Sequence, residues 1–398
     1  MALSKKLEML TKKMQKDYDV HMVDVAANTS GRIIPTHSTG SLLLDMVCGT
    51  GPRAGFPEGR IIEIYGPESS GKTTTALLAI AARQREEDQK EMMTPGYSKK
   101  YCLYVDAEHA LDLRIAEEYG VNLEEMIVIN PTTSEDAMDV LDTYIRTGDI
   151  GIVVVDSVPA LLPSSVEKAS YNQQFMAILA RFMSVLMQKI TGPTYQTGTT
   201  LIFINQIREK PGAYSPTGVA ETTPGGRALK FSSSIRLSVR AGERIKEGDQ
   251  VIGHKIKIKN IKNKIDMPYK EAELTLIYGH GIDRVAEVFQ VALKAGIIKQ
   301  GGAWFSYIDE ETGEIAEFGG EQMKFQGREK CIDALRRHPM FYGELEDLIR
   351  GVEVEADSMS EEEIQAMKKA ERDAEEENLQ IAERIAKKQK KEGLPDAE

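Results

Sequence analysis

Short apolar runs, separated by segments rich in helix-forming residues, dominate the first half of the chain. The five runs are Ile61–Tyr65, Tyr101–Val105, Met126–Ile129, Gly151–Val155 and Leu201–Ile204. Each has the length of a strand and is almost uniformly apolar, as a strand buried on both faces requires. The pattern predicts an α/β fold in which a mostly parallel, twisted sheet is flanked by helices.

Three later runs alternate polar and apolar residues, which predicts antiparallel edge strands with one face in water. They are Ile235–Val239, Lys255–Ile261 and Glu273–Tyr278. Gly279–Gly281 then predicts a domain boundary. Beyond it we expect a helix, an aromatic hairpin and a basic helix, which together indicate a small α+β domain. These are Arg284–Ala295, Trp304–Ile308 with a turn near Gly313, and a helix through Arg336 and Arg337.

The two ends of the chain have patterns of their own. Leu3, Leu7, Leu10 and Met14 recur at helical spacing, which predicts a short amphipathic helix with lysines on its other face. We expect this helix to pack on a neighbouring copy, and packing on its own domain is the alternative that the sequence leaves open. We therefore expect an oligomerisation segment (1–36), a core (37–280), a C-terminal α+β domain (281–352) and a charged, helical or disordered tail (353–398).

The composition favours a cytoplasmic protein without a membrane partner. The chain has no apolar run of about 18 residues, the length that a transmembrane helix needs. Its first residues lack the apolar centre of a signal peptide. Cys48, Cys102 and Cys331 form no CxxC pair, so we expect neither a disulfide framework nor a structural zinc site.

The net charge of −12 conceals an uneven distribution. Residues 353–398 contain 15 acids and 8 bases, a net of −7, which leaves −5 for the rest of the chain. Residues 224–270 contain 12 bases and 4 acids, a net of +8. A basic block of this kind is typical of a surface that follows a phosphate backbone, although charged runs are more often solvated faces.

The segment from Gly66 to Thr73 fits the pattern G-x-x-x-x-G-K-[ST], and a predicted strand precedes it while a predicted helix, Thr75–Arg85, follows. Glycines in such a loop let backbone N–H groups point at phosphates from a helix N-terminus. Lys72 adds a positive charge near the β- and γ-phosphates, and the Thr73 hydroxyl can bind Mg²⁺. The alternative is a glycine-rich turn that matches by chance.

Acidic residues follow two of the predicted strands. Asp156 comes directly after an apolar run, where it would lie beside the phosphate loop and hold the metal's water ligands. Asp106 and Glu108 follow another run, and a carboxylate there can orient and deprotonate an attacking water. The residues alone do not decide between these two.

A pair of amides, Asn205 and Gln206, ends the fifth run and begins a segment rich in Gly, Pro and Thr that extends to Gly226. An amide at this place can donate a hydrogen bond to a γ-phosphate, or it can belong to an ordinary turn. So long an irregular segment inside a domain is usually functional, which favours the first alternative.

Seven segments together resemble the bacterial RecA recombinases. They are GPESSGKTT (66–74), DAEHALD (106–112), VVVDSVPAL (153–161), IFINQIR (202–208), ETTPGGRALKF (221–231), KNKI (262–265) and GGAWFSY (301–307). They occur in the family's order, and the similarity covers about Ser38 to about Tyr307, with insertions that suit a phage-encoded member. The resemblance implies a P-loop RecA-like ATPase core, ATP and Mg²⁺ as cofactors, and DNA-dependent ATP hydrolysis. It further implies helical filaments on single-stranded DNA that pair it with double-stranded DNA and exchange strands in recombination and repair.

The resemblance also implies roles at the ATP site. Glu108 matches the catalytic carboxylate, which decides against Asp106, and it acts with Lys72 and with Gln206, the link between the γ-phosphate and a DNA-binding loop. Thr73 and Asp156 are the implied magnesium-binding residues. The implied nucleotide contacts are Gly66, Pro67, Glu68, Ser69, Ser70, Gly71, Lys72, Thr73, Thr74, Asp112 and Pro268, with Lys262 and Lys264 reaching ATP on the neighbouring subunit.

The DNA contacts that the resemblance implies lie in two loops and along the basic block. They are Met176, Arg181, Tyr214, Gly225, Gly226, Arg227, Arg240, Lys257 and Lys259. The last three fall inside the block with the net charge of +8, so two lines of reasoning meet there. The implied partners are DNA, further copies of the chain, and single-strand-binding and loading proteins.

The chain also departs from the family pattern. Ile115 stands where the family usually places an aromatic ring against adenine, and Lys168–Phe175 lacks the glycines usual in the first DNA loop. Gln89–Lys100 is expected to be an insertion that follows the P-loop helix.

Two other functions share part of this evidence. A ring-forming helicase of related fold would have the P-loop, the strand-end acids and a basic channel, but the segments KNKI and GGAWFSY argue against it. A DNA-coating protein without ATPase activity is disfavoured because Lys72, Thr73, Glu108 and Asp156 are all present.

Overall fold

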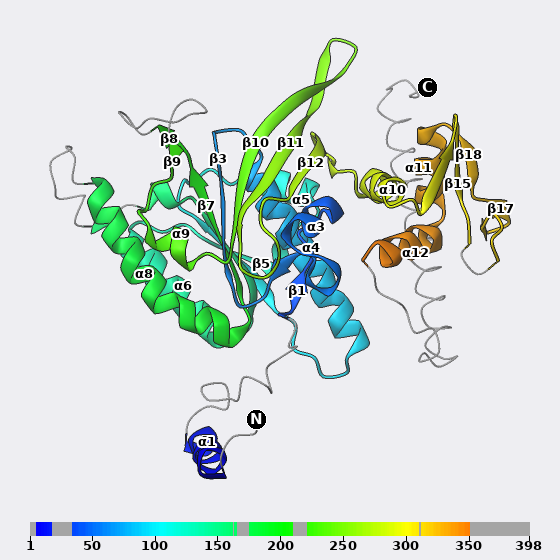
Figure 1. Ribbon diagram of the computed structural model, residues 1–398. Helices are drawn as coiled ribbons and strands as arrows, with labels where there is room; N and C mark the ends of the chain where they lie inside the picture. The colour runs from blue at the N-terminus through cyan, green and yellow to red at the C-terminus, as the bar shows by residue number, and fades with distance from the viewer. Residues whose placement is uncertain are drawn as a thin grey trace. The chain divides into compact units, whose positions relative to one another are not determined.

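The computed structural model describes residues 5–17, 34–161, 163–164, 175–209, 221–309 and 312–350. A sheet of nine strands lies at the centre of this part of the chain, in the order β13-β12-β11-β10-β3-β7-β6-β4-β5 (Figure 1). The bounds are β3 Ile61–Gly66, β4 Tyr101–Asp106, β5 Met126–Ile129, β6 Ile150–Asp156, β7 Thr200–Gln206, β10 Ile235–Glu247, β11 Gln250–Asn263, β12 Glu271–Ile277 and β13 Gly281–Ile282. All pairs among β3, β7, β6, β4 and β5 are parallel, so the predicted α/β class is confirmed.

Four of the apolar runs became central strands with both faces buried, whereas β5 lies at the edge of the sheet with Met126 buried and its other residues partly exposed. Alternate residues of each strand feed two hydrophobic clusters on opposite faces of the sheet: Ile62 and Ile64 belong to one, and Ile61 belongs to the other. Helices α3 and α4 cover the first face, and α6 and α8 cover the second. The helix bounds are α3 Leu42–Cys48, α4 Lys72–Met93, α5 Leu113–Glu118, α6 Ser134–Thr147, α8 Phe175–Thr197 and α9 Ala228–Ser232, with short 3₁₀ turns η1 Gly51–Arg53, η2 Leu123–Glu125 and η3 Val158–Ala160.

Two expectations about these elements are wrong. Strands β10 and β11 are not edge strands. Strand β11 lies between β10 and β12, and β10 runs parallel to β3 on one side and pairs antiparallel with β11 on the other. The alternating pattern of β10 arises because Leu237 and Val239 are buried while Arg236 faces partners on the neighbouring strand. The P-loop helix α4 runs to Met93, so the segment expected as an insertion after it begins inside its last turns.

The region beyond β13 has a second hydrophobic core, which Leu42 of α3 joins. Strands β14, β15 and β18 form an antiparallel sheet, and an isolated bridge joins Ile308 to Ile315, which confirms the turn near Gly313. The predicted helices at Arg284 and through Arg336 are also present. The elements are α10 Arg284–Lys294, β14 Ile298–Gly301, β15 Trp304–Tyr307, β16 Glu317–Phe318, β17 Glu321–Gln322, β18 Lys324–Gln326, α11 Arg328–Arg337 and α12 Pro339–Arg350.

The remaining elements are short. Strand β1 (Thr36–His37) pairs with β2 (Phe56–Pro57), and β8 (Arg208–Glu209) pairs with β9 (Glu221–Thr222). Residues 208–209 and 221–222 were expected to be irregular, and this expectation is wrong. Helix α1 spans Lys5–Asp17 with its leucines half exposed.

Some of the remaining sequence-based expectations can be compared with the structure, and others concern residues that it does not describe. None of the described helices is long and apolar enough to cross a bilayer. All three cysteines are buried and free. Leu3, Tyr214, most of Lys168–Phe175 and the tail 353–398 lie outside the described residues.

Candidate functional site

The glycine-rich loop between β3 and α4 has a backbone that only glycine fits at two points. A Cβ on Gly66 would lie 2.0 Å from the carbonyl oxygen of Val239. Gly71 has φ +92°, and its Cβ would lie 2.5 Å from Cδ1 of Ile256. Helix α4 begins at the next residue, Lys72, so the loop presents the N-terminal N–H groups of a long helix, which favours an anion.

Lys72 lies in this loop among carboxylates. Its ammonium donates a hydrogen bond to the carbonyl of Pro67 at 2.6 Å. Burial lowers the pKa of Lys72, and the carboxylates of Asp156, Glu108 and Glu68 partly offset that change. A lysine bound to a peptide carbonyl can exchange that contact for a phosphate oxygen, which carries more negative charge.

Asp156 ends β6 and meets two hydroxyl groups. Its Oδ2 accepts hydrogen bonds from Thr73 Oγ1 at 2.8 Å and from the Tyr104 phenol at 2.7 Å. Burial raises the pKa of Asp156, and the two hydroxyl donors lower it again. A carboxylate beside a hydroxyl suits Mg²⁺, which binds few protein oxygens and keeps several waters.

The two acids that follow β4 have different surroundings in the structure. Asp106 is buried and accepts hydrogen bonds from the N–H groups of Ala110 and Leu111, so it shapes the turn. Glu108 is exposed and accepts hydrogen bonds from Ser157 and from Gln206, the latter at 3.2 Å. The geometry thus favours Glu108 as the carboxylate that faces a ligand.

The two amides at the end of β7 also have different surroundings. Asn205 is fully buried, and its Nδ2 donates to Glu63 at 3.0 Å and to the carbonyl of Pro224 at 3.1 Å. Gln206 is partly exposed and reaches Glu108. Asn205 therefore ties the two ends of the loop together, whereas Gln206 faces the carboxylate beside the P-loop.

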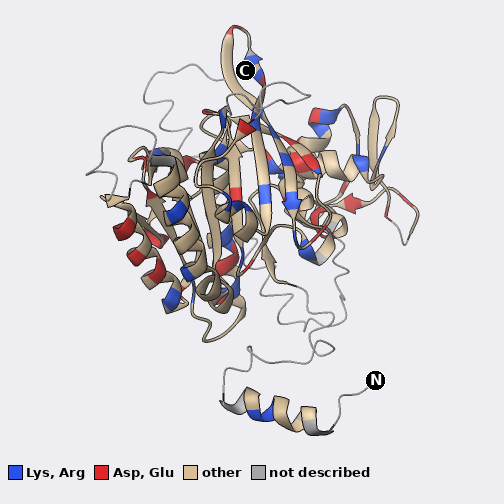
Figure 2. Ribbon diagram, turned by 60° about the vertical axis from the view of Figure 1, so that its left-hand side comes forward, with Lys and Arg blue, Asp and Glu red and all other residues tan. Residues whose placement is uncertain are grey.

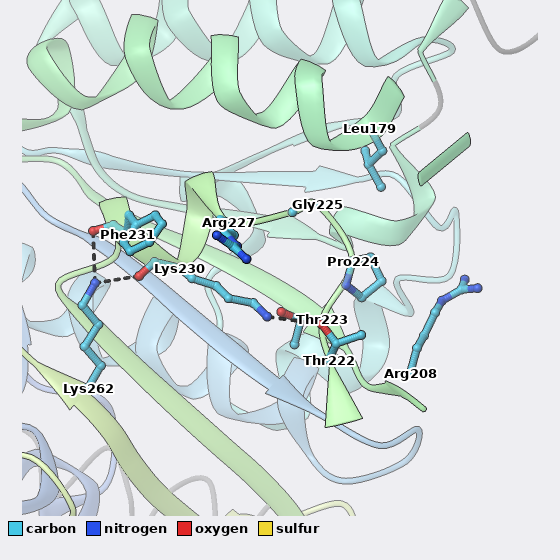
Figure 3. Close-up of a pocket in the computed structure, with 11 residues that line it drawn as sticks. Leu179, Arg208, Thr222, Thr223, Pro224, Gly225, Arg227, Lys230, Phe231 and Lys262 are labelled. Carbon is cyan, nitrogen blue, oxygen red and sulfur yellow. Dashed lines mark hydrogen bonds between the residues drawn. The ribbon is translucent and has the colours of Figure 1, made fainter. Parts of the chain in front are cut away.

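A cavity of about 610 Å³ lies at the base of this loop (Figure 3). It is rich in basic side chains, and Gly225 and Gly226 shape its wall with φ +84° and +74°. Its lining residues are Leu179, Arg208, Thr222, Thr223, Pro224, Gly225, Gly226, Arg227, Lys230, Phe231 and Lys262. A cavity with this lining suits an anionic ligand.

Lys262 and Lys264 converge on the end of α9. The ammonium of Lys262 donates to the carbonyls of Lys230 at 2.6 Å and Phe231 at 3.0 Å, as Figure 3 shows. That of Lys264 donates to Phe231 at 3.0 Å. Burial, followed by repulsion from Lys264, lowers the pKa of Lys262 to about 8. The pair thus caps the helix that follows the segment 207–226, which we call the second loop.

Acidic side chains from outside the basic block pair with some of its bases, which the net charge of +8 did not include. Arg240 forms an ion pair with Glu221, Lys257 with Glu273 and Lys259 with Glu271. All three acids lie just outside the counted window, and Figure 2 shows acids interspersed with bases along these strands. The block is therefore less positive than the sequence count alone indicated.

The other predicted residues are spread over several elements. Asp112 caps α5 by accepting from the N–H of Arg114 at 2.9 Å. Pro268 lies in the turn before β12, and Arg181 is exposed on α8. Met176 is in the first turn of α8. The sequence reasoning missed Tyr104 and Ser157, which looked like an ordinary strand residue and an ordinary turn residue.

Comparison with known proteins shows the family of the chain. A model described as the RecA N-terminal domain matches residues 4–283, and one described as the RecA C-terminal domain matches residues 286–352. The chain is 39% identical over 364 residues to Protein RecA of Halalkalibacterium halodurans, covering 90% of this chain and 96% of that protein. It is 42% identical over 346 residues to Protein RecA of Lactobacillus johnsonii, covering 87% of this chain and 88% of the relative. It is 42% identical over 329 residues to Protein RecA of Cereibacter sphaeroides, covering 83% of this chain and 88% of that relative. The chain therefore belongs to the RecA family of DNA recombination and repair proteins.

Proposed function

We propose that this protein is a DNA-dependent ATPase that forms filaments on single-stranded DNA and exchanges strands with homologous double-stranded DNA. The loop from Gly66 to Thr73 binds the phosphates of ATP, and Thr73 and Asp156 would hold the Mg²⁺ that offsets the charge of the phosphates. Glu108 orients and deprotonates the water that attacks the γ-phosphate. DNA is bound and released without covalent change.

The observation that supports this proposal best is the contact between Gln206 and Glu108, 3.2 Å from Nε2 to Oε1. Glu108 lies beside the P-loop, and Gln206 is the last residue of β7, directly before the second loop. A γ-phosphate and its attacking water would enter at this contact and compete for the Gln206 amide. The presence of ATP is thereby conveyed to the loop.

The lysine cap on α9 supports a second part of the proposal. In a filament, Lys262 and Lys264 reach the triphosphate on the neighbouring subunit. To do so, their ammonium groups exchange the carbonyls of Lys230 and Phe231 for phosphate oxygens. Binding of one nucleotide by two subunits makes assembly depend on ATP.

The test measures binding to single-stranded DNA with ATP, with ADP and without nucleotide. The wild-type protein should bind most tightly with ATP. Lys72→Ala should lose ATP turnover and the ATP dependence of DNA binding. Glu108→Ala should lose turnover but keep ATP-dependent binding, because it removes the base and no phosphate ligand. Lys189→Ala, which changes an exposed lysine on α8, is the charge-matched control and should behave like the wild type.

Electron microscopy with a non-hydrolysable ATP analogue, together with a strand-exchange assay, distinguishes the alternatives. Open helical filaments and exchanged strands support the proposal. Closed rings that unwind duplexes would support a helicase instead. Equal DNA affinity of the wild-type protein in all three nucleotide conditions would refute the coupling.

A further inference from the structure

Tyr104 is a buried polar residue beside the proposed magnesium site, and the proposed function assigns it no role. It lies in β4, is 1% exposed and packs in the hydrophobic cluster between the sheet and α4. Its neighbours along the strand, Leu103 and Val105, belong to the cluster on the opposite face. The alternation of the strand therefore directs the Tyr104 ring toward the helix that begins at the P-loop.

The ring reaches along the sheet to Asp156. In the parallel register Tyr104 lies opposite Val154 of β6, yet its hydroxyl donates to Oδ2 of Asp156 at 2.7 Å. Asp156 is two residues further along β6, which corresponds to about 6–7 Å of strand. A serine or threonine at position 104 would be too short to cover this distance, and a phenylalanine would lack the donor. A tyrosine is thus suited to place a hydroxyl at this carboxylate.

Two hydroxyl groups hold the carboxylate of Asp156. Thr73 Oγ1 donates to the same Oδ2 at 2.8 Å. Because both donors use one oxygen, Oδ1 is left for other donors. Mg²⁺ keeps several of its water ligands when it binds to a protein, and such waters can donate hydrogen bonds. The orientation of the carboxylate therefore decides whether Oδ1 can accept from them.

The two hydroxyl groups differ in their surroundings. Thr73 is partly exposed at the start of α4, and its oxygen is the one proposed to bind the ion. Tyr104 lies in a close-packed cluster, where its ring cannot turn without displacing its neighbours. Since Tyr104 belongs to the sheet and not to the phosphate loop, its hydrogen bond to Asp156 does not depend on the nucleotide.

We propose that Tyr104 is a positioning residue for the magnesium site: its hydroxyl fixes the carboxylate of Asp156 so that Oδ1 can accept hydrogen bonds from water ligands of the ion. A hydrogen bond to a charged group is stronger than one between neutral groups. Loss of this bond should therefore weaken the contribution of the metal to nucleotide binding about 3- to 30-fold. This inference rests on the proposed Mg-ATP site and deepens it.

The test measures the affinity of the full chain for a non-hydrolysable ATP analogue by calorimetry, once with Mg²⁺ and once with EDTA. The ratio of the two affinities is the gain that the metal provides. Tyr104→Phe keeps the ring in the cluster and removes only the hydroxyl. It should reduce the gain about 3- to 30-fold and leave the affinity in EDTA within about twofold of the wild type, because the phosphate loop is unchanged. A residue that only supported the fold would change both affinities alike.

The C-terminal region offers a matched control. Tyr307 is 3% exposed, and its hydroxyl also donates to a carboxylate, that of Glu344, at 2.5 Å. Tyr307→Phe therefore removes a buried bond of the same kind away from the phosphate loop, and it should keep the wild-type gain. Asp156→Asn provides a second comparison. This variant should lose most of the gain, and adding Tyr104→Phe to it should cause no further change, because Tyr104 acts through Asp156.

The outcomes distinguish this inference from the proposed function. An unchanged or larger gain in Tyr104→Phe would overturn the inference. An equal loss of affinity in Mg²⁺ and in EDTA would also overturn it, as would a further loss when Tyr104→Phe is added to Asp156→Asn. A wild-type protein whose affinity for the analogue does not depend on Mg²⁺ would overturn the proposed metal site and this inference with it.

Discussion

The joint between the core and the C-terminal region contains a buried carboxylate that should make stability depend on pH. Glu287 on α10 is buried and accepts hydrogen bonds from Ser41 Oγ at 2.8 Å and from the N–H of Leu42 at 3.0 Å. Ser41 is the N-cap of α3 in the core. Burial raises the pKa of Glu287 to about 7, Asp45 adds to the rise, and the two hydrogen bonds and Arg284 oppose it.

The size and sign of the effect follow from linkage. A pKa near 7 in the folded chain and an ordinary value of 4.5 mean that the folded state binds the extra proton between these two pH values. The associated stability is fully present below about pH 4.5 and is lost as the pH rises through about 7. Between pH 5.5 and pH 8 the loss amounts to about 2 kcal/mol of unfolding free energy.

The assay is urea denaturation at pH 5.5 and pH 8, followed by the fluorescence of Trp304, which lies in the C-terminal region. Glu287→Gln imitates the protonated acid, because its amide can donate to Ser41 while its oxygen accepts from Leu42. The wild-type protein should lose stability between the two pH values relative to this variant. Glu317→Gln, which changes an exposed acid in the same region, should retain the wild-type pH dependence. If the wild type and Glu287→Gln respond equally to pH, the reasoning about this joint is wrong.

Three further predictions concern the nucleotide and DNA sites. Ser157→Ala removes one hydrogen bond to Glu108. ATP turnover should fall about tenfold while the affinity for ATP stays unchanged. A changed affinity for ATP would contradict the idea that Ser157 acts through Glu108. Tyr104→Phe removes a donor that lowers the pKa of Asp156, so the acid limb of the turnover–pH profile should move to higher pH; an unmoved limb would argue against this link. Replacing both Glu271 and Glu273 by Gln frees Lys259 and Lys257. The affinity for DNA should rise, and the slope of log affinity against log salt concentration should become more negative by up to about two. Glu314→Gln, which changes an exposed acid elsewhere, should change neither quantity.

The parts of the fold that the sequence predicted are those that local pattern determines. An apolar run buried on both faces has few alternatives to a central parallel strand. All five predicted runs are parallel strands, and four of them are central, while β5 lies at the edge of the sheet. The P-loop was predictable because glycines, a lysine and a hydroxyl follow a strand at fixed spacing. The alternation in β10 was ambiguous, because an inner strand with Arg236 opposite a buried acid has the same pattern as an edge strand.

The parts that the sequence did not predict depend on contacts between distant segments. The count of +8 ended at Lys270, directly before Glu271 and Glu273, which a cross-strand register places opposite Lys259 and Lys257. The residues alone likewise did not decide between Asn205 and Gln206, a choice that only the resemblance made, because it depends on which side chain points into the sheet. Neither register nor direction is visible until the strands are paired.

One charged residue in the first apolar run shows how these distant contacts bear on function. Glu63 is fully buried in β3, and it accepts hydrogen bonds from Arg236 of β10 at 2.5 Å and from Asn205 of β7 at 3.0 Å. The same Asn205 amide holds the carbonyl of Pro224. Separating a buried carboxylate from its partners is costly, about 3–5 kcal/mol when one partner is removed. The strand before the P-loop and both ends of the second loop are therefore fixed to one another. Under the proposed mechanism, a nucleotide would therefore act on this loop through the side chain of Gln206 and not by displacing the strands.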